Sequence, residues 1–362
     1  MSTNVVPVRD VLTHLIDQVR QRAAEIDISI VCNRRDSPIP TGDFDRHSLR
    51  TEFYSDRELS EVIGNLRRHG LNIINVFDEE AFFRTSIHGQ RPNDRMHVLM
   101  NFGSARLGPW GKTLIPAVAD ALGWVATNSN AYSVALARHK FHCAAILDGI
   151  GIRSARTWCF SVANGWIGRG VPPQNLDVLI QPAYESASIG VDTESRRTVD
   201  LSITQVCADM AMQFRQDVIA REFICGYEVE VPLVCLDAWY PLEPIGITVG
   251  GFAQLNDRYL KYEDVLDDAY GFYPAVRELG TECATALQQT AQAVAKALGL
   301  RGFSRVDYRV TLDGRAYVTD ISASPHFIEH SSFAYAAELA EMDPAALPVL
   351  LVGLALHREQ ML

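Results

Sequence analysis

Two acidic side chains near the carboxyl end of the chain have the spacing most directly suited to chemistry. They lie in RVDYRVTLDGRAYVTDIS, residues 305–322, which alternates apolar and polar positions on both sides of Asp313-Gly314. That dipeptide favours a two-residue hairpin turn, and pairing outward from the turn places Asp307 opposite Asp320. Opposed residues lie roughly 4.5–5.5 Å apart at Cβ, where like charges repel each other. A cation between the two carboxylates would remove this repulsion.

The same register assigns the neighbouring side chains to faces. Arg305 and Ser322 would share the face of the two aspartates, whereas Thr319 would take the opposite face. Carboxylate and hydroxyl oxygens suit a hard cation such as Mg²⁺ or Mn²⁺, which completes its shell with water and phosphate oxygens. We therefore predict a metal held by Asp307, Asp320 and Ser322. The spacing alone leaves a second interpretation open, a solvated hairpin whose acids pair with arginines of the same strand.

The loop that follows supplies further context. With SASPHFIEHSS at 322–332, the segment 302–332 resembles the closing segment of the D-alanine–D-alanine ligase branch of the ATP-grasp superfamily. In that family one strand carries an Arg and an Asp, and the next carries an acidic residue and an Asn. A Ser-Pro-Gly loop then leads to a His-Ser that helps to hold the substrate carboxylate. This chain departs from the pattern at Ser322, in place of Asn, and at His326, in place of the loop Gly.

The resemblance implies roles for three of these residues. Arg305 would stabilise the acyl phosphate and then the tetrahedral intermediate, and His330 and Ser331 would hold the carboxylate of the attacking amino acid. Solvent-exposed loop histidines remain the alternative for His326 and His330.

Two further segments resemble the parts of the family that bind phosphates. Lys140 stands where the family has its first nucleotide lysine. DVLIQPAYESASIGV, residues 177–191, resembles the flap that closes over the phosphates and contains Ser188 in a phosphate-facing place. Gln181 stands where the family has a second lysine, and its amide supplies no charge.

REFICGYEVEVPLV resembles the hinge that holds adenine and ribose. The resemblance implies that the main chain of Glu222, Phe223 and Ile224 faces the purine edge and that Glu228 binds the ribose hydroxyls. The family's hinge opens with two acidic residues, whereas this one opens with Arg221. An edge strand with one wet face is the alternative interpretation of its alternating glutamates.

LKYEDVL resembles the lysine-tyrosine loop that covers the site in these ligases. Lys261 and Tyr262 match the loop, and Lys261 would replace some of the phosphate-binding charge lost at Gln181. Both are therefore included among the predicted site residues.

Helix and strand patterns alternate through the first part of the chain, as in an α/β layer domain. Helical periodicity over 11–24 precedes a short apolar strand at 28–32, and a capping box at Ser55 opens a second helix. The polar stretch 33–54 matches no loop of the family. It is either a replacement substrate lid, which would include Arg34, Arg35 and DFDRH, or a solvated connection.

Together the patterns and the resemblance predict an α/β protein of the ATP-grasp (α+β) fold. We expect an N-terminal α/β substrate domain over 1–125, a central ATP-grasp lid subdomain over 126–220 and a C-terminal ATP-grasp catalytic subdomain over 221–362.

Composition excludes several classes of protein. Of 362 residues, 48% are hydrophobic and 21% are charged, as in a globular protein, and the net charge of −11 disfavours a nucleic-acid partner. Seven cysteines without a CxxC pair indicate reduced thiols. The N-terminus lacks the apolar core of a signal peptide, and the apolar run at 346–356 is too short to span a bilayer. We expect a cytoplasmic protein with no membrane partner; the oligomeric state stays open, a homodimer included.

The predicted function is an ATP- and Mg²⁺-dependent carboxylate–amine ligase that releases ADP. Its partners would be small amino-acid or amine substrates, in small-peptide or specialised-metabolite synthesis rather than D-Ala-D-Ala synthesis. Gln181 and Ser322 keep open a second hypothesis, a degenerate or weakly active nucleotide-binding protein. A metal-dependent hydrolase that uses the aspartate pair is a third, but it leaves Lys140 and the hinge unexplained.

Overall fold

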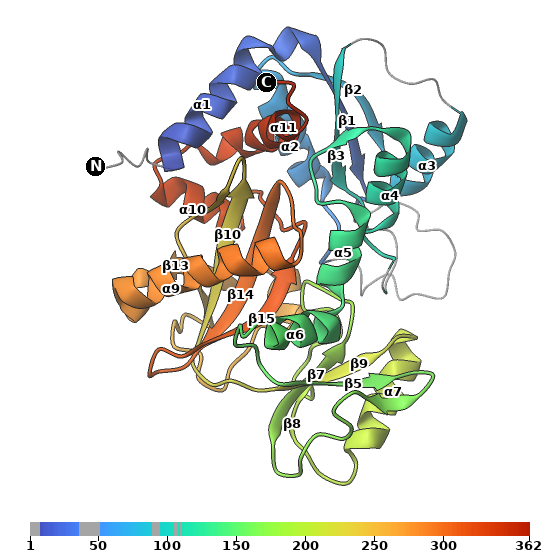
Figure 1. The fold of residues 1–362 in the computed structure, drawn as a ribbon, viewed down its shortest axis with the longest axis vertical. Coiled ribbons are helices and arrows are strands. Elements are labelled where there is room, and N and C mark those ends of the chain that lie inside the picture. Colours follow the sequence, from blue (N-terminus) through green and yellow to red (C-terminus); the bar gives the residue numbers. More distant parts are fainter. Residues whose placement is uncertain (1–7, 36–50, 89–94, 105–107, 109) are drawn as a thin grey trace.

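The computed structural model describes residues 8–35, 51–88, 95–104, 108 and 110–362. Three β-sheets follow one another along the long axis (Figure 1). The N-terminal sheet lies at one end, the sheet formed by the last part of the chain lies in the middle, and the sheet formed by the central part lies at the other end. We call them the N-terminal sheet, the middle sheet and the lid sheet.

The N-terminal sheet is parallel, with strand order β2-β1-β3-β4. Its strands are β1 (Ile26–Cys32), β2 (Asn72–Phe77), β3 (Met96–Phe102) and β4 (Val125–Ala126), and its helices are α1 (Val8–Gln21), α2 (Asp56–Arg68), α3 (Glu79–His88) and α4 (Leu114–Leu122), with a short helix η1 (Ala23–Glu25). Every residue of β1 and β3 is buried because helices cover both faces of the sheet. The capping box predicted at Ser55 is confirmed: Ser55 and Glu58 exchange both hydrogen bonds.

The lid sheet is antiparallel, with strand order β6-β5-β9-β7-β8. It consists of β5 (Thr157–Ser161), β6 (Gly165–Ile167), β7 (Asp177–Pro182), β8 (Arg196–Thr198) and β9 (Val218–Glu222), covered on one side by α7 (Ile203–Phe214). Its small core is separate from the others, since Trp158, Val178 and Ile180 pack only against α7 and neighbouring strands.

The middle sheet has strand order β13-β12-β10-β14-β15, with β11 paired to β10. Its strands are β10 (Tyr227–Cys235), β11 (Trp239–Pro241), β12 (Ile245–Val249), β13 (Tyr270–Pro274), β14 (Phe303–Val310) and β15 (Ala316–Ser322). Around it lie α5 (Ala131–Arg138), α6 (Lys140–Gly149), α8 (Tyr262–Leu266), α9 (Val276–Ala297) and α10 (Ser332–Leu339). The last elements, η2 (Pro344–Ala346) and α11 (Leu347–Arg358), pack against α2 of the N-terminal part of the chain. Leu287 and Val294 of α9 are buried against this sheet.

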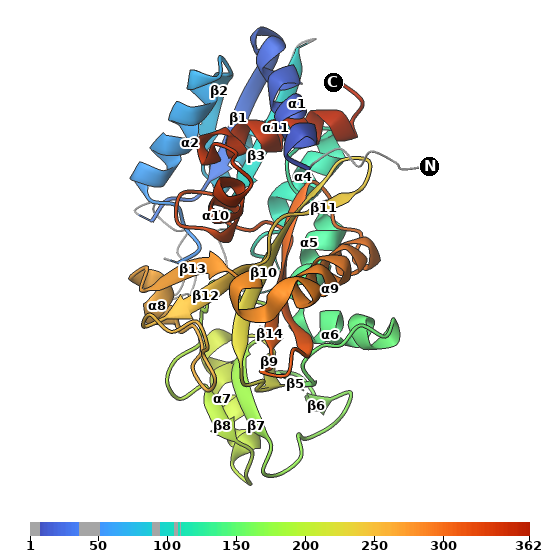
Figure 2. The ribbon, with the colours of Figure 1, turned by 90° about the vertical axis from the view of Figure 1, so that its left-hand side faces the viewer.

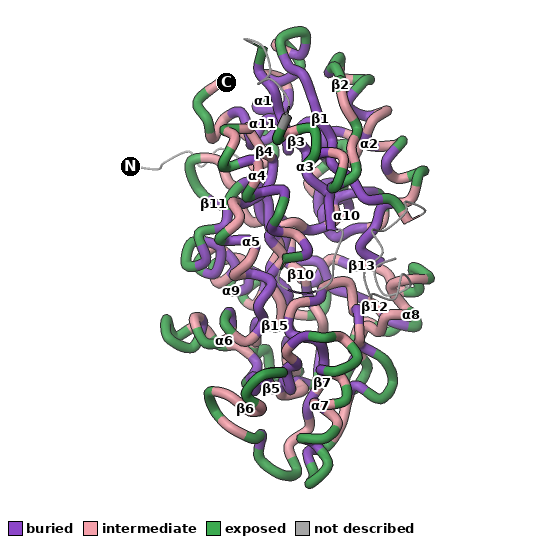
Figure 3. Tube along the Cα trace, turned by 90° about the vertical axis from the view of Figure 1, so that its right-hand side faces the viewer, coloured by how far each residue is buried: buried purple, intermediate pink, exposed green. Residues whose placement is uncertain are grey.

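The first and last helices of the described residues, α1 and α11, pack together beside the N-terminal sheet. Helix α11 packs along α1 and returns the last residues to the first domain (Figure 1). Its residues from Leu347 to Leu356 are all buried, which confirms the interpretation of the apolar run as a closing helix. In Figure 3 the buried trace follows the strands of the N-terminal and middle sheets, and exposed positions gather at turns and at the far end of the lid sheet.

The β14–β15 hairpin differs from the predicted one at its turn. The strands end at Val310 and begin again at Ala316, and the Thr311 N–H donates to the Arg315 carbonyl at 3.0 Å. The predicted two-residue turn is therefore wrong. A β-bulge next to Asp307 shifts the register once more.

The bulge restores the predicted pairing where it matters. Asp307 pairs with Asp320 and Arg305 with Ser322, as the sequence indicated. Thr319 is the extra residue of the bulge, and its hydroxyl donates to the Asp307 carbonyl at 3.1 Å. It lines a cavity instead of packing in the core, so its predicted face is corrected.

The remaining expectations from the sequence concern membrane spans, the cysteines, the segment 33–54 and the domain bounds. No helix within the described ranges is long and apolar enough to cross a membrane. All seven cysteines are free thiols, and most of them are at least partly buried. Most of the proposed replacement lid, residues 36–50 with DFDRH, lies outside the described residues. The division into domains at 125 and 220 stays a prediction.

The close approach of α11 to α1 gives a stability test. A Cβ at Gly353 would lie 2.8 Å from Leu15 Cγ and 3.1 Å from Val19 Cγ2. We expect Gly353→Ala to lower the free energy of unfolding by about 1–3 kcal/mol because α1 must move. Gly64→Ala in α2 is the matched control: nothing lies within 4 Å of its Cβ. Alanine favours the helix there, so stability should rise by about 0.5–1 kcal/mol. Urea denaturation followed by circular dichroism measures both, and equal effects would contradict the packing.

Candidate active site

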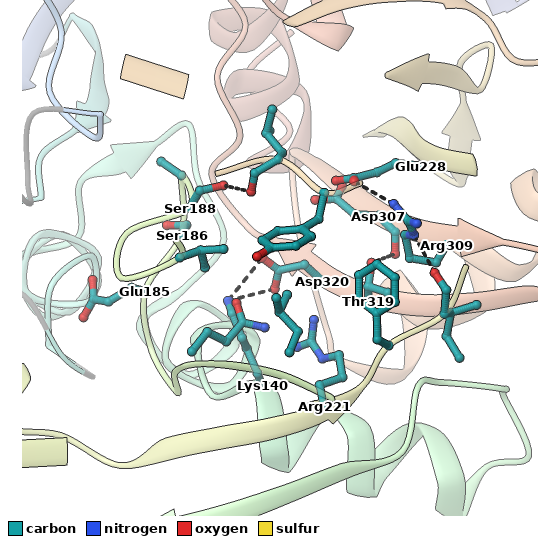
Figure 4. A pocket seen from close by; sticks show the side chains of 18 of the residues that line it. Lys140, Glu185, Ser186, Ser188, Arg221, Glu228, Asp307, Arg309, Thr319 and Asp320 are labelled. Carbon is teal, nitrogen blue, oxygen red and sulfur yellow. Dashed lines mark hydrogen bonds and ion pairs between the residues drawn. The ribbon is translucent and has the colours of Figure 1, made fainter. Parts of the chain in front are cut away.

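A cavity between the lid sheet and the middle sheet collects most of the predicted site residues (Figure 4). Strands β7 and β9 with the loop after β7 form one wall, and β10, β14 and β15 form the other. Ten predicted residues line it: Lys140, Gln181, Ser188, Glu222, Phe223, Ile224, Glu228, Arg305, Asp307 and Asp320. Figure 2 shows the two sheets, one above the other, that contribute these strands.

The opposed aspartates form the floor of this cavity, and each is paired with a cation. Arg305 donates to both oxygens of Asp307 at 2.7 and 2.8 Å. Lys140 Nζ, at the start of α6, lies 3.1 and 3.2 Å from the two oxygens of Asp320. Pairing across β14 and β15 therefore brings two carboxylates together, and two different elements supply the charges that hold them.

The surroundings move the pKa values of the two acids in opposite directions. Burial raises the pKa of Asp307 despite Arg305, and neighbouring Glu230 adds to the rise. Burial would also raise the pKa of Asp320, but Lys140 and Arg221 outweigh it and the pKa is lowered. Burial thus disfavours the charged form of Asp307 by more than Arg305 recovers, and a divalent cation bound there would favour that charged form.

The donor set fits Mg²⁺ that is shared with phosphates. No group of three or more His, Cys, Asp or Glu side chains in the described part of the chain could hold a metal alone. Mg²⁺ is usually bound through one or two carboxylates plus substrate phosphates, not by an all-protein cage. Asp307 and Asp320 offer this arrangement. Ser322 lies on the same face opposite Arg305 but does not line the cavity.

The loop after β7 is anchored from both sides, and we call residues 184–191 the flap. Two of its non-glycine residues, Ala187 and Ser188, have φ values of 50° and 55°, a strained backbone that functional loops often retain. Ser188 Oγ donates to the Leu260 carbonyl at 3.0 Å, and the Tyr262 N–H donates to the Val191 carbonyl at 2.9 Å. The lysine-tyrosine loop thus lies against the flap. Its predicted role of covering the site stays a prediction.

Glu185 holds the base of the flap. Its carboxylate accepts hydrogen bonds from the Gly108 N–H at 2.6 Å and from Gln216 Nε2 at 2.7 Å, and Arg138 lies 3.3 Å away. The side chain is buried. This one carboxylate joins the lid sheet, the loop before α4 and the end of α5.

The hinge residues Glu222, Phe223 and Ile224 line the cavity. The N–H groups of Glu222 and Phe223 donate to carbonyls of neighbouring strands at 2.8 and 2.9 Å. No described group accepts from the Ile224 N–H, whose carbonyl accepts from Arg309 Nε at 2.9 Å. Arg309 also reaches Glu228 at 3.3 Å. The hinge backbone and Glu228 are therefore held by one guanidinium.

Five predicted residues lie outside the cavity lining. Lys261 caps α8, and Tyr262 packs with Phe53 and Ile189. Ser331 caps α10 by accepting from the Ala334 N–H at 3.1 Å. His330 lies against the rings of Tyr270 and Phe272, with centroids 4.6 and 5.1 Å away. Ser322 is the fifth.

The predicted site residues do not include Glu230, Arg309, Arg221 and Thr319, four polar side chains that also line the cavity. Glu230 pairs with Asp307 across β10 and β14 and lies 3.1 Å from Arg305. The alternation of Glu228 and Glu230 was visible in the sequence. Its partner strand was not, because the paired residues are far apart along the chain.

A second buried ion pair connects the flap to the N-terminal domain. Glu52 lies 2.6 Å from Lys112 Nζ and accepts from Ser186. Burial would raise the pKa of Glu52, but Lys112 and Arg138 outweigh it and lower the pKa to about 2. The carboxylate is therefore charged throughout the neutral range.

Comparison with known proteins assigns the fold and the site to a family. Residues 170–352, which include the flap, the hinge and the aspartate pair, match the model of the family described as D-ala D-ala ligase C-terminus. The chain belongs to this family. The predicted resemblance is confirmed.

Two relatives show how far the likeness extends. The D-alanine–D-alanine ligase of Aromatoleum aromaticum is 28% identical over 222 residues, which cover 61% of this chain and 67% of the relative. That of an Azoarcus species is 25% identical over 269 residues, 72% and 83% of the two chains.

Solved structures agree with the fold. The D-alanine–D-alanine ligase of Bacillus anthracis complexed with ATP superposes with a TM-score of 0.67, covering 92% of this chain and 99% of that one at 16% identity. The VanG D-Ala:D-Ser ligase of Enterococcus faecalis gives a TM-score of 0.66 at 17% identity, covering 91% and 99%. The predicted ATP-grasp fold is confirmed.

This ligase-family chain is an ATP- and Mg²⁺-dependent enzyme that joins a carboxylate to an amine and releases ADP. Phosphoryl transfer of this kind asks the protein mainly to position its reactants and to neutralise charge. The cavity contains groups suited to both tasks: carboxylates and arginines on strands, and Lys140 at the start of α6.

The aspartate floor gives a catalytic test. We expect Asp320→Asn to lower kcat for ADP formation by more than about 100-fold, because it removes a preorganised charge at the reacting phosphates. Gln181→Ala should cost less, since an amide carries no charge. Asp313→Asn is the matched control in the exposed turn of the same hairpin. A greater loss for Gln181→Ala than for Asp320→Asn would show that the aspartate is not the main contributor.

The Glu52–Lys112 pair gives a pH-dependent test of stability. Lys112→Met leaves Glu52 buried without its nearest cation, and we expect a loss of about 3–5 kcal/mol at pH 7. The native pair contributes fully above pH 4.5, the ordinary pKa of glutamate, and its contribution disappears as pH falls toward 2. The deficit should therefore shrink in acid, as measured by urea denaturation from pH 7 to pH 3. Glu52→Gln combined with Lys112→Met should recover part of the stability; a deficit independent of pH would contradict the pairing.

Proposed function

We propose that this ligase joins an amino-acid carboxylate to an amino acid or other amine and that its preferred product is not D-alanyl-D-alanine. Small-peptide or specialised-metabolite synthesis is the setting that such a reaction suits. The nucleotide occupies the cavity between the lid and middle sheets. The observation that carries this placement is the opposed Asp307 and Asp320 on the cavity floor, directly below the flap and beside the hinge.

The roles of the groups that line the cavity follow from their position. The resemblance alone implies the roles of the five predicted residues outside that lining, Lys261, Tyr262, Ser322, His330 and Ser331. The hinge takes the purine edge at the Ile224 N–H, and Glu228 takes the ribose hydroxyls. Lys140, Gln181 and Ser188 contact the phosphates, and Asp307, Asp320 and Ser322 ligate the metal. Arg305 and Lys261 supply positive charge at the transferred phosphoryl group, and Glu222 and Phe223 complete the hinge contacts. Tyr262, His330 and Ser331 contact the substrate.

Bound Mg²⁺ supplies the charge that neutralises the phosphate oxygens during transfer. Arg305 is placed for two states of the reaction. Its guanidinium lies between Asp307 and Glu230, with its nitrogens 2.7 Å and 3.1 Å from their oxygens. When metal and phosphates satisfy Asp307, the guanidinium is available to the acyl phosphate and then to the oxyanion of the tetrahedral intermediate.

The side chains around His326 and His330 support a product other than D-alanyl-D-alanine. His326 replaces the family's loop glycine, and its ring packs at a tilt against that of Tyr54 with centroids 4.7 Å apart. Tyr54 in turn stacks on Phe102 at 5.2 Å. Tyr270 and Phe272 flank His330 nearby. Aromatic and imidazole rings thus occupy space that a backbone without side chains leaves open, which changes the shape offered to a substrate.

The second hypothesis, a degenerate nucleotide-binding protein, is motivated by Gln181 and Ser322. Both lie beside groups that keep the site charged: Gln181 lines the same cavity as Lys140, and Ser322 is paired with Arg305. These neighbours favour turnover, and the experiment below measures it directly.

A substrate screen tests the proposal. We would incubate the protein with ATP, Mg²⁺ and pools of D- and L-amino acids and amines, with and without hydroxylamine, and measure ADP, AMP, phosphate and hydroxamate. Substrate-dependent ADP and a trapped hydroxamate are expected, at a rate with D-alanine alone below that of the best pool. The Asp320→Asn protein controls for contaminating ATPase.

Each other outcome has a defined meaning. AMP in place of ADP would indicate adenylation and contradict the acyl phosphate. ATP binding without turnover would favour the degenerate protein. Two D-alanines as the best pair would contradict the substrate proposal. His326→Gly restores the family's loop, and we expect it to raise the kcat/KM for D-alanine relative to the preferred substrate.

A further inference from the structure

Arg221 is a buried cation whose role the family pattern does not explain. It lies near the end of β9, is 8% exposed, and lines the cavity beside Lys140 and Asp320 (Figure 4). Its neighbours across the lid sheet are Thr157 and Leu179. The strand thus holds its guanidinium at the wall of the cavity, facing the aspartate floor.

The guanidinium has no partner within the described residues. No described oxygen accepts a hydrogen bond from it, and it forms no ion pair with a described carboxylate. Lys140 already occupies Asp320, and Arg305 occupies Asp307. Burial lowers the pKa of Arg221, and Asp320 is its strongest opposing charge. A buried cation without hydrogen-bond acceptors is costly, and an anionic ligand in the cavity would supply them.

The strand register of the lid sheet places Arg221 on the same face as Gln181, the position at which the family has a lysine. Gln181 pairs with Ile219, and Arg221 lies two residues along β9, so both side chains share the cavity face. Diagonal neighbours on a sheet lie within reach of long side chains. A guanidinium at 221 can therefore extend into space that a lysine at 181 would occupy.

We infer that Arg221 binds the phosphate groups of the nucleotide and carries the positive charge that Gln181 lacks. The inference rests on the proposal that the nucleotide occupies this cavity. Arginine forms paired, charge-assisted hydrogen bonds with phosphate oxygens, which lysine cannot do. The net charge of the phosphate site is thereby retained, although its source has moved from β7 to β9.

Equilibrium binding of ADP and adenosine, by calorimetry with Mg²⁺ present, separates phosphate contacts from base contacts. We expect Arg221→Gln to weaken ADP binding by about 10- to 100-fold and to leave adenosine binding unchanged, because only ADP offers charged oxygens. Arg221→Lys should retain part of the affinity. Arg197→Gln, an arginine on β8 of the same sheet outside the cavity, is the matched control.

A double variant that moves the positive charge from position 221 to position 181 is the decisive test. Gln181→Lys combined with Arg221→Gln should recover most of the lost ADP affinity, because the cation returns to the neighbouring strand. A purely structural role of Arg221 would not be rescued by a lysine at 181.

Three results would overturn the inference: unchanged ADP binding by Arg221→Gln, equal losses of ADP and adenosine, or no recovery in the double variant. If Arg221→Gln does not fold, Arg221→Lys and the double variant still test it. Failure of the wild-type protein to bind ADP would instead contradict the placement of the nucleotide itself.

Discussion

The site depends on the electrostatic repulsion between carboxylates that the middle sheet places next to one another. Strands β14 and β15 place Asp307 and Asp320 directly opposite each other, and β10 adds Glu230 beside them. Carboxylates on adjacent strands destabilise a sheet unless cations are supplied. Arg305 supplies one from the same strand, and Lys140 supplies another from α6. These ion pairs offset the repulsion, and the two carboxylates remain on one face of the cavity, where we propose that a metal binds.

The need for cations explains why the cavity lies between two sheets. Arg305 and Arg309 come from the middle sheet, whereas Lys140 and Arg221 approach from the side of the lid sheet. Closing the cavity therefore brings positive charge from separate elements onto one floor. A lysine lost at one position can be compensated from a neighbouring strand, because phosphate oxygens respond to the location of the charge and not to the element that carries it.

The flap is controlled by contacts that lie well away from the aspartates. Glu185 holds its base to the start of α4 and the end of α5, and Ser186 reaches Glu52 of the N-terminal domain. Ser188 bonds the loop before α8. The N-terminal, lid and middle parts of the chain are therefore coupled through one short segment. Changes in the N-terminal loops, where the family resemblance is weakest, can alter the substrate side while the aspartate floor stays the same.

Local sequence determined the elements and the identity of the acids. Alternation in 305–322 predicted two strands and the pairing of Asp307 with Asp320, and the capping box at Ser55 predicted where α2 begins. The predicted turn was one residue too short. The bulge at Thr319 offset that error. Neither the longer turn nor the bulge can be read from an alternation of apolar and polar residues. Only the tertiary structure decided that Glu230 joins the floor, that Arg309 holds the hinge and that Arg221 lines the cavity. These contacts join strands distant in sequence, and side-chain spacing within one strand carries no information about which strand becomes its neighbour.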